Sequence, residues 1–200
     1  MSAIAAYVAE LQKRRAKAAT LLRPGMPNAL ARLKKELPIL APPADLGELW
    51  AVFDGAAGDN ELLDDLWLDG TFYIFSLAEA VEDYRICDDI RAGDPDFEDY
   101  WPTGYLPIAT PGDGSRLLVD CVAGSPTHGS VFELFHGIGI ARSAASIEAY
   151  FRTAHAWLEK GVLKVMPDGK LDIDHERASD IARGMNPDCE NWAEDTGNDQ

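Results

Sequence analysis

Residues 101–132, which read WPTGYLPIATPGDGSRLLVDCVAGSPTHGSVF, decide the fold. Three apolar and β-branched runs, at residues 105–110, at 116–121 and from 129 onward, are separated by clusters of glycine, proline and aspartate. Such runs bounded by turn-forming residues are typical of β-strands. The PGDGS segment is too short for a phosphate-binding loop and lacks its lysine, so it predicts a hairpin turn. We therefore expect this stretch to form the middle of a small antiparallel sheet.

Downstream of this stretch the sequence predicts a strand pair, a helix and a hairpin. Residues 131–134 and 138–141 are strand-like around Gly137. A helix is expected from residue 143 to residue 161, because apolar residues recur at helical spacing over three turns and a glycine follows. Residues 162–173 alternate around a Pro-Asp-Gly turn, which predicts a hairpin. The helix should cover one side of the sheet.

Upstream, the pattern begins with three helices. Residues 2–22 fit an amphipathic helix with basic later turns, which Arg23-Pro24-Gly25 should end because proline cannot continue the backbone bonding. A second helix is expected over residues 28–37. A third should begin after Pro43 and end at Asp54-Gly55.

Between these helices and the sheet, a further strand pair and helix are expected. Residues 66–68 and 71–75 look like strands around the turn Asp69-Gly70, a dipeptide that tolerates positive φ angles. Ser76 is followed three residues later by Glu79, the capping-box spacing that begins a helix.

Length and composition indicate one domain with additional segments at its ends. The 200 residues, 46% hydrophobic and 26% charged, suit a folded soluble protein, and no window is apolar enough to span a membrane. We expect a basic helix in residues 1–26, the main domain in 27–175 and an acidic tail in 176–200, loosely ordered from about residue 186. The first residues place their basic side chains after a short apolar run, the reverse of a secretory signal, which predicts a cytoplasmic protein.

The net charge of −16 is unevenly distributed. Residues 1–36 hold eight basic and two acidic side chains, whereas residues 37–100 hold seventeen acidic ones and two basic ones, Arg85 and Arg91. A negative field of this kind repels phosphate backbones and anionic lipids. The sequence therefore predicts no direct contact with nucleic acid or membrane and favours a basic protein partner, although acidity alone also serves solubility.

Catalytic, metal and cofactor sites are not indicated. The three cysteines are an odd number without close spacing, which predicts free thiols. The four histidines are scattered, so no zinc site is expected, and DGKLDID lacks the glycine and the terminal glutamate of a calcium loop. No serine lies in a G-x-S-x-G elbow. We expect no catalytic residues and no cofactor.

The order of the motifs is informative. A proline-led helix (PADLGELWAVFDG) is followed by a strand and helix (WLDGTFYIFSLAEAVEDY), then by a tryptophan, LPIATPGDGSRLLVDCVAG and HGSVF. This order resembles the SUKH superfamily, the bacterial relatives of fungal Smi/Knr cell-wall regulators, over roughly residues 27–160. The matching positions, interpreted as structural, are Pro43, Leu49, Trp50, Asp54, Gly55, Trp101, Leu106, Pro107, Ile108, Ala109, Gly112, Asp120, Gly124, Gly129 and Val131.

The resemblance implies an α+β fold, a mostly antiparallel central sheet flanked by helices, and no enzymatic activity. Many bacterial members look like immunity proteins that neutralise secreted toxins, often nucleases. An acidic surface would suit the cationic groove of such a toxin, because opposite potentials speed encounter while buried aromatic residues supply affinity. The candidate contact residues are acidic side chains with one aromatic anchor: Asp64, Asp65, Trp67, Asp88, Asp89, Asp94, Asp96 and Glu98.

Three other functions stay open on the sequence. The first is an intracellular scaffold or regulator of cell-wall synthesis, as the fungal relatives suggest. The second is an enzyme with an unrecognised site, which a deep pocket with converging carboxylates or a perturbed His128 would indicate. The third is a ligand-binding module built on the sheet. The sequence does not indicate an oligomeric state.

Overall fold

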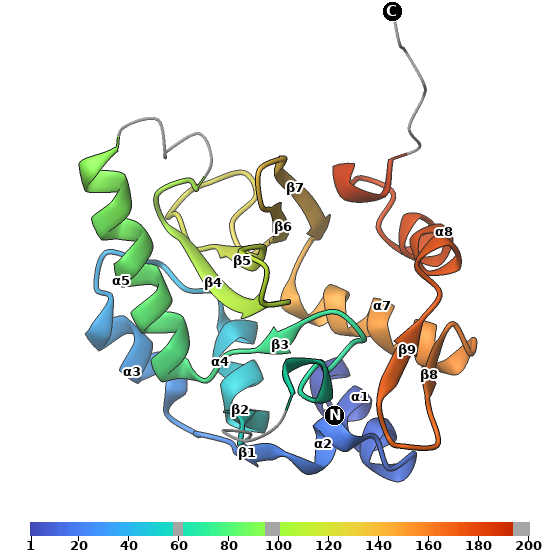
Figure 1. Ribbon diagram of the computed structural model, residues 1–200. Coiled ribbons are helices and arrows are strands. Elements are labelled where there is room, and N and C mark those ends of the chain that lie inside the picture. The colour runs from blue at the N-terminus through green and yellow to red at the C-terminus, as the bar shows by residue number, and fades with distance from the viewer. Residues whose placement is uncertain (58–61, 95–100, 194–200) are drawn as a thin grey trace, which may run out of the picture.

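A computed structural model describes residues 1–57, 62–94 and 101–193 (Figure 1). Its centre is a five-stranded antiparallel sheet in the order β3-β4-β5-β6-β7. The strands are β3 (Tyr73–Ile74), β4 (Tyr105–Thr110), β5 (Arg116–Asp120), β6 (Val131–Phe135) and β7 (Gly139–Ala144). The α+β fold with a mostly antiparallel central sheet flanked by helices is confirmed.

Helices and two small sheets surround this centre. The α-helices are α1 (Ala3–Lys13), α2 (Lys17–Thr20), α3 (Ala29–Glu36), α4 (Ala44–Val52), α5 (Leu77–Gly93), α7 (Ile147–Glu159) and α8 (His175–Met185), and the short 3-10 helices are η1 (Leu63–Asp65) and η2 (Glu190–Trp192). Strand β1 (Leu22–Pro24) pairs with β2 (Phe53–Ala56), and β8 (Leu163–Val165) pairs with β9 (Leu171–Ile173). No helix in this described part is long and apolar enough to cross a membrane.

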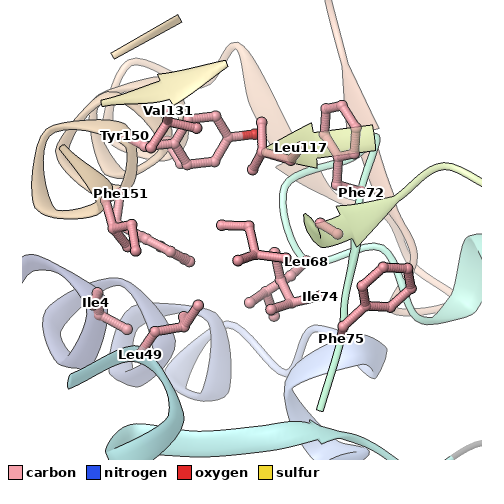
Figure 2. Close-up of a cluster of buried hydrophobic side chains, with 14 of the residues drawn as sticks. Ile4, Leu49, Leu68, Phe72, Ile74, Phe75, Leu117, Val131, Tyr150 and Phe151 are labelled. Carbon is pink, nitrogen blue, oxygen red and sulfur yellow. The ribbon is translucent and has the colours of Figure 1, made fainter. Parts of the chain in front are cut away.

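The main core lies on one face of the sheet. Leu117 and Val131 point from β5 and β6 toward Phe151 of α7, Ile4 of α1 and Leu49 of α4 (Figure 2). All five side chains are almost completely shielded from solvent. Because successive strand residues point to opposite faces, the alternate residues of the same strands are left for a second cluster.

That second cluster is smaller and lies on the opposite face. Leu118 and Leu134 pack there with Cys87 of α5 and with Trp101. Tyr105 and Phe132 flank them, with ring centroids 5.1 Å apart. Figure 1 shows α5 running alongside the sheet next to β4. The α5 helix is therefore held by an apolar inner side and presents its outer side to solvent.

Most of the expected elements are confirmed. The second and third helices appear as α3 and α4, and the strand pairs on both sides of Gly137 and Gly169 are present. The capping box is also confirmed: Ser76 Oγ accepts from the backbone N–H of Glu79 at 3.2 Å, and Glu79 Oε2 accepts from the backbone N–H of Ser76 at 2.7 Å. All three cysteines are free and buried.

The prediction of one N-terminal helix over residues 2–22 is wrong. Helix α1 stops at Lys13, because Arg15 takes a left-handed φ of 63° and Ala16 donates its backbone N–H to Leu11 O at 3.0 Å. This 6→1 bond is the Schellman arrangement, usually built with glycine. The buried Ala16 then leads into α2, where Lys17 N donates to Gly169 O at 2.7 Å. A contact distant in sequence thus overrides local helix propensity.

The expected strand over residues 66–68 is absent. Asp69 explains the difference, because its Oδ1 accepts from the backbone N–H groups of Thr71 and Phe72 at 2.9 and 2.8 Å. The Asp69 side chain therefore accepts from backbone N–H groups that would otherwise pair two strands. One backbone hydrogen bond of the expected hairpin is still present, from Leu68 N to Phe72 O. Asp54-Gly55 likewise forms part of β2 and does not simply terminate the third helix.

Two expectations near the C-terminus are also corrected. Helix α7 begins at Ile147, with Ser146 as its N-cap, whereas Ser143 belongs to β7. Residues 186–193 are not loosely ordered: Asn186 Nδ2 donates to Thr153 Oγ1 at 3.0 Å. Residues 194–200 lie outside the described part. The division into segments 1–26, 27–175 and 176–200 stays a prediction, and α1 and α8 both contact α7.

Candidate functional site

The outer side of α5 is the first candidate site. The helix is fixed at its start by the capping box and by Asp54, whose Oδ1 accepts from Leu77 N at 2.8 Å. Gly55 next to Asp54 has a φ of 70°, and a Cβ there would lie 2.6 Å from Ser76 N. Glycine is therefore required where the β2 backbone touches the beginning of α5. The family motif Asp54-Gly55 thus positions this helix.

Acidic and apolar side chains predominate along this outer side, which also carries Arg85, paired with Glu36 of α3 at 2.9 Å. Glu82, Ile86 and Asp89 follow one another at four- and three-residue spacing, and Ile90 lies one turn after Ile86. The two isoleucines are 50% and 45% exposed. Neither Glu82 nor Asp89 forms an ion pair with any described residue, whereas Asp88, on the flank of the same helix, pairs with Arg91. We call Glu82, Ile86, Asp88, Asp89 and Ile90 the α5 surface.

The predicted acidic contact residues divide into separate groups. Asp88 and Asp89 belong to the α5 surface, and Asp94 is exposed at the C-cap of the same helix. Asp64 and Asp65 lie in η1 on the side of α2 and the β8–β9 hairpin, which Figure 1 shows well away from the C-terminal end of α5. Asp96 and Glu98 lie outside the described residues. The described acidic candidates therefore do not share one surface.

The η1 group is largely neutralised by the chain itself. Asp65 is 5% exposed and accepts from Lys17 Nζ at 2.9 Å, with Lys170 Nζ 3.4 Å away. The hydrogen bond from Lys17 holds the pKa of Asp65 below its usual value, with Lys170 acting in the same direction. Asp64 pairs with Lys170 at 2.8 Å. Trp67 packs against the main core, so it is not an exposed anchor.

The remaining motif positions support turns and packing. Asp120, which is fully buried, accepts from Val122 N at 2.8 Å, Ser125 Oγ at 2.5 Å and Thr127 Oγ1 at 2.8 Å. One carboxylate thereby organises the loop between β5 and β6. Gly124 in this loop has a φ of 76°.

The same holds for the aromatic and proline positions of the motif. Trp50 Nε1 donates to Phe75 O at 2.9 Å, and Trp101 Nε1 donates to Tyr105 O at 3.1 Å. Pro43 is the N-cap residue of α4, and a Cβ on Gly129 would lie 3.4 Å from its ring. Pro107 lies where the register of β4 shifts against β5. These residues stabilise the packing of helices and strands and do not together form a binding surface.

A cavity of about 290 Å³ lies between the sheet and the C-terminal segment. Its buried floor contains Asp69, Glu133 and Tyr150, and His175 and Asn191 line it from the more exposed C-terminal segment. The walls are largely aromatic, formed by Phe72, Phe135, Trp157 and Trp192. Ile173, Ala178 and Ser179 complete one side. The cavity thus combines buried carboxyl groups with aromatic surfaces.

Glu133 is one of the two buried acids in this cavity. Its Oε1 accepts from Ser143 Oγ at 2.9 Å, and Ser143 Oγ accepts in turn from Asn191 Nδ2 at 2.9 Å. Burial raises the pKa of Glu133 to about 7, although the hydrogen bonds from Ser143 and Asn191 oppose the shift. The side chain is therefore close to half-protonated near neutral pH.

Asp69 is held differently. In addition to the two backbone N–H groups, its Oδ2 accepts from Tyr150 Oη at 2.5 Å. Burial raises the pKa of Asp69, and these donors act against that shift. Burial also raises the pKa of Tyr150 well above its usual value, so this hydroxyl remains a donor at neutral pH.

Sequence reasoning missed both cavity acids. Glu133 lies in the apolar strand segment VFELF with two-residue alternation, so its inward position was detectable as a charged residue on a core face. Asp69 was hidden because an Asp-Gly pair predicts a turn. His128 is not part of the cavity: it lies in an exposed loop with Nε2 2.6 Å from Ala41 O. Among the described residues, no three potential ligands gather to hold a metal ion.

Comparison with known proteins gives one assignment. A search of the curated proteins found no match. The family model described as the SMI1 / KNR4 family (SUKH-1) matches residues 26–158, which include α5, all five strands of the central sheet and most of α7. The match covers well over half of the chain, and the chain belongs to the SMI1/KNR4 (SUKH-1) family.

Proposed function

We propose that this chain is a non-enzymatic binding protein of the immunity type, which neutralises a toxin domain by covering a basic surface of it. The observation that carries this proposal is the α5 surface, where Ile86 and Ile90 are exposed one turn apart beside Asp88 and Asp89. Family membership supports the general class, since the resemblance implies immunity proteins among bacterial members.

The physical argument rests on charge and apolar contact together. An acidic helix attracts a basic partner at long range and repels nucleic acid, which selects the toxin over its substrate. Two adjacent isoleucines add apolar area that is removed from water when the partner docks. Asp88 is already paired with Arg91, so Asp89 and Glu82 offer the more available charges. Asp94 extends the acidic side at the end of α5.

The test is association with a toxin domain encoded beside this gene. The full chain should bind it in a one-to-one complex and abolish its activity. Asp89→Lys should weaken binding by about tenfold and reduce the salt dependence of the association rate. The matched control is Asp172→Lys, which makes the same charge change at an exposed position of β9. Equal binding by both variants would overturn the role of the α5 surface.

A regulator of cell-wall synthesis is the alternative function, as the resemblance to the fungal Smi/Knr proteins suggests. Affinity capture distinguishes the two functions, because the regulator should recover proteins of envelope synthesis and give no protection against a toxin.

A further inference from the structure

We propose that the cavity between the sheet and the C-terminal segment binds a small organic cation, an ammonium or guanidinium group on an apolar stem, with Glu133 as its pairing carboxylate. The site is separate from the α5 surface, so this inference does not depend on the identity of the protein partner.

The first support is the absence of an internal cation. Two acids elsewhere that are largely shielded from solvent have one: Asp65 pairs with Lys17, and Asp83 pairs with Arg116 at 2.8 Å, whereas the fully buried Asp120 is held by three N–H and O–H donors. Within the described ranges, neither Asp69 nor Glu133 pairs with a lysine or arginine, and no lysine or arginine lines the cavity. Because a buried carboxylate is costly without a counter-charge, an entering cation would supply what the chain does not.

The second support is the chemistry of the walls. The indole rings of Trp157 and Trp192 lie 6.3 Å apart in an edge-to-face arrangement, and each uses its N–H within the chain. Their remaining surface is aromatic carbon, which attracts cations through the ring quadrupole and accommodates an alkyl stem. A neutral apolar ligand would gain from the rings but would leave Glu133 without a counter-charge.

The third support is the size and construction of the cavity. A volume of about 290 Å³ is at the lower end of the range for ligand sites, which suits a molecule with a short alkyl chain. The floor comes from the region matched by the family model, whereas His175, Asn191 and Trp192 come from the segment beyond residue 158. The cavity is thus a feature that this C-terminal segment adds to the family domain.

Isothermal titration calorimetry on the full chain tests the proposal with n-butylammonium and n-butylguanidinium, and with n-pentanol as a neutral probe of similar size. At about pH 8, where Glu133 is charged, at least one of the two cations should bind at least about tenfold more tightly than the alcohol. Failure of both cations to bind folded protein, or alcohol binding equal to that of the better cation, would overturn the inference.

Two matched substitutions locate the pairing group. Glu133→Gln should weaken cation binding by about tenfold, whereas Glu159→Gln, on an exposed position of α7, should leave it unchanged. Circular dichroism and thermal unfolding establish that both variants are folded. Unchanged binding by Glu133→Gln would overturn the role of Glu133.

The pH dependence gives an independent readout. The other titratable groups that line the cavity are Asp69, Tyr150 and His175. Cation affinity should rise between about pH 6 and about pH 8 as Glu133 loses its proton, and this rise should vanish in Glu133→Gln but persist in His175→Gln. Loss of the rise in His175→Gln alone would contradict the assignment.

An ammonium or guanidinium group for this cavity can come from a free amine or from a lysine or arginine side chain. Capped lysine and arginine amides distinguish them. If the amides bind as tightly as the free amines, the site accepts a protein side chain, and if only the free amines bind, it accepts a small molecule. Both outcomes support the cation site.

Discussion

Asp65 and Glu133 are both buried acids, but their surroundings give them opposite titration behaviour. Asp65 lies between the ammonium groups of Lys17 and Lys170, and its pKa is lowered. Glu133 accepts a hydrogen bond from the neutral hydroxyl of Ser143, and burial raises its pKa to about 7. Burial alone therefore does not decide whether a carboxyl group is charged. The presence or absence of a neighbouring cation decides it, and four substitutions that alter these surroundings test the difference.

The largest effect is expected for Glu133→Gln. The raised pKa means that folded protein binds this proton more tightly than unfolded protein, so the free energy of unfolding should fall as pH rises from about 4.5 to about 7. The glutamine amide does not titrate, so the variant does not lose this stability as pH rises. Above pH 7 the variant should therefore be more stable than the parent by up to about 3 kcal/mol. Urea unfolding at a series of pH values measures this difference, and parallel curves for parent and variant would contradict it.

Trp192→Ala should have the next largest effect. The indole covers Glu133's cavity, contacts Trp157 and donates to Ser143 O at 2.7 Å. Its removal should cost about 2 kcal/mol and should let water reach Glu133, so that the pKa of Glu133 moves back toward its usual range. Trp192→Phe is the control, since it keeps an aromatic ring and loses only the N–H donor. A carboxyl titration followed by NMR reports the pKa, and an unshifted value in the alanine variant would show that Trp192 does not shield the acid.

Asp65→Asn should produce the reverse pH signature. A lowered pKa contributes stability above the usual pKa of 3.8, and this contribution is lost as pH falls through the folded-state value. The variant should therefore have a lower urea midpoint at neutral pH, and the gap between parent and variant should close on acidification. A gap that persists at low pH would mean that packing, and not the lysine pairs, is what the substitution removes.

The sequence was sufficient for the parts of this protein that local chemistry determines. The capping box at Ser76, the turn at Gly169 and the strands that surround residues 111–115 were all predictable, because their residues satisfy their own backbone groups. The break after Lys13 was not, since a contact with Gly169 supports it from a distant position in the chain.

The candidate sites show the same limit. The acidic composition of α5 was visible in the sequence, but the lysine partners of η1 were not. Lys17 and Lys170 come from opposite ends of the chain, and only the folded structure brings them to Asp65. The ordered structure of residues 186–193 was not predictable either. Their composition is acidic and amidic, and the packing of Trp192 against Trp157 is evident only in the folded chain.

The smallest effect on stability is expected for Asp64→Asn. This substitution tests whether the exposure of an ion pair or its short distance determines its contribution. Asp64 shares Lys170 with Asp65, but its side chain is 43% exposed, so water already screens the pair. When Asp64 is neutralised, Lys170 still has Asp65 at 3.4 Å, and the urea midpoint should hardly move. A double-mutant cycle with Lys170→Met measures the coupling directly, and it should be weaker for Asp64 than for Asp65. A stronger coupling for Asp64, despite its exposure, would show that the shorter distance of 2.8 Å outweighs burial in this cluster.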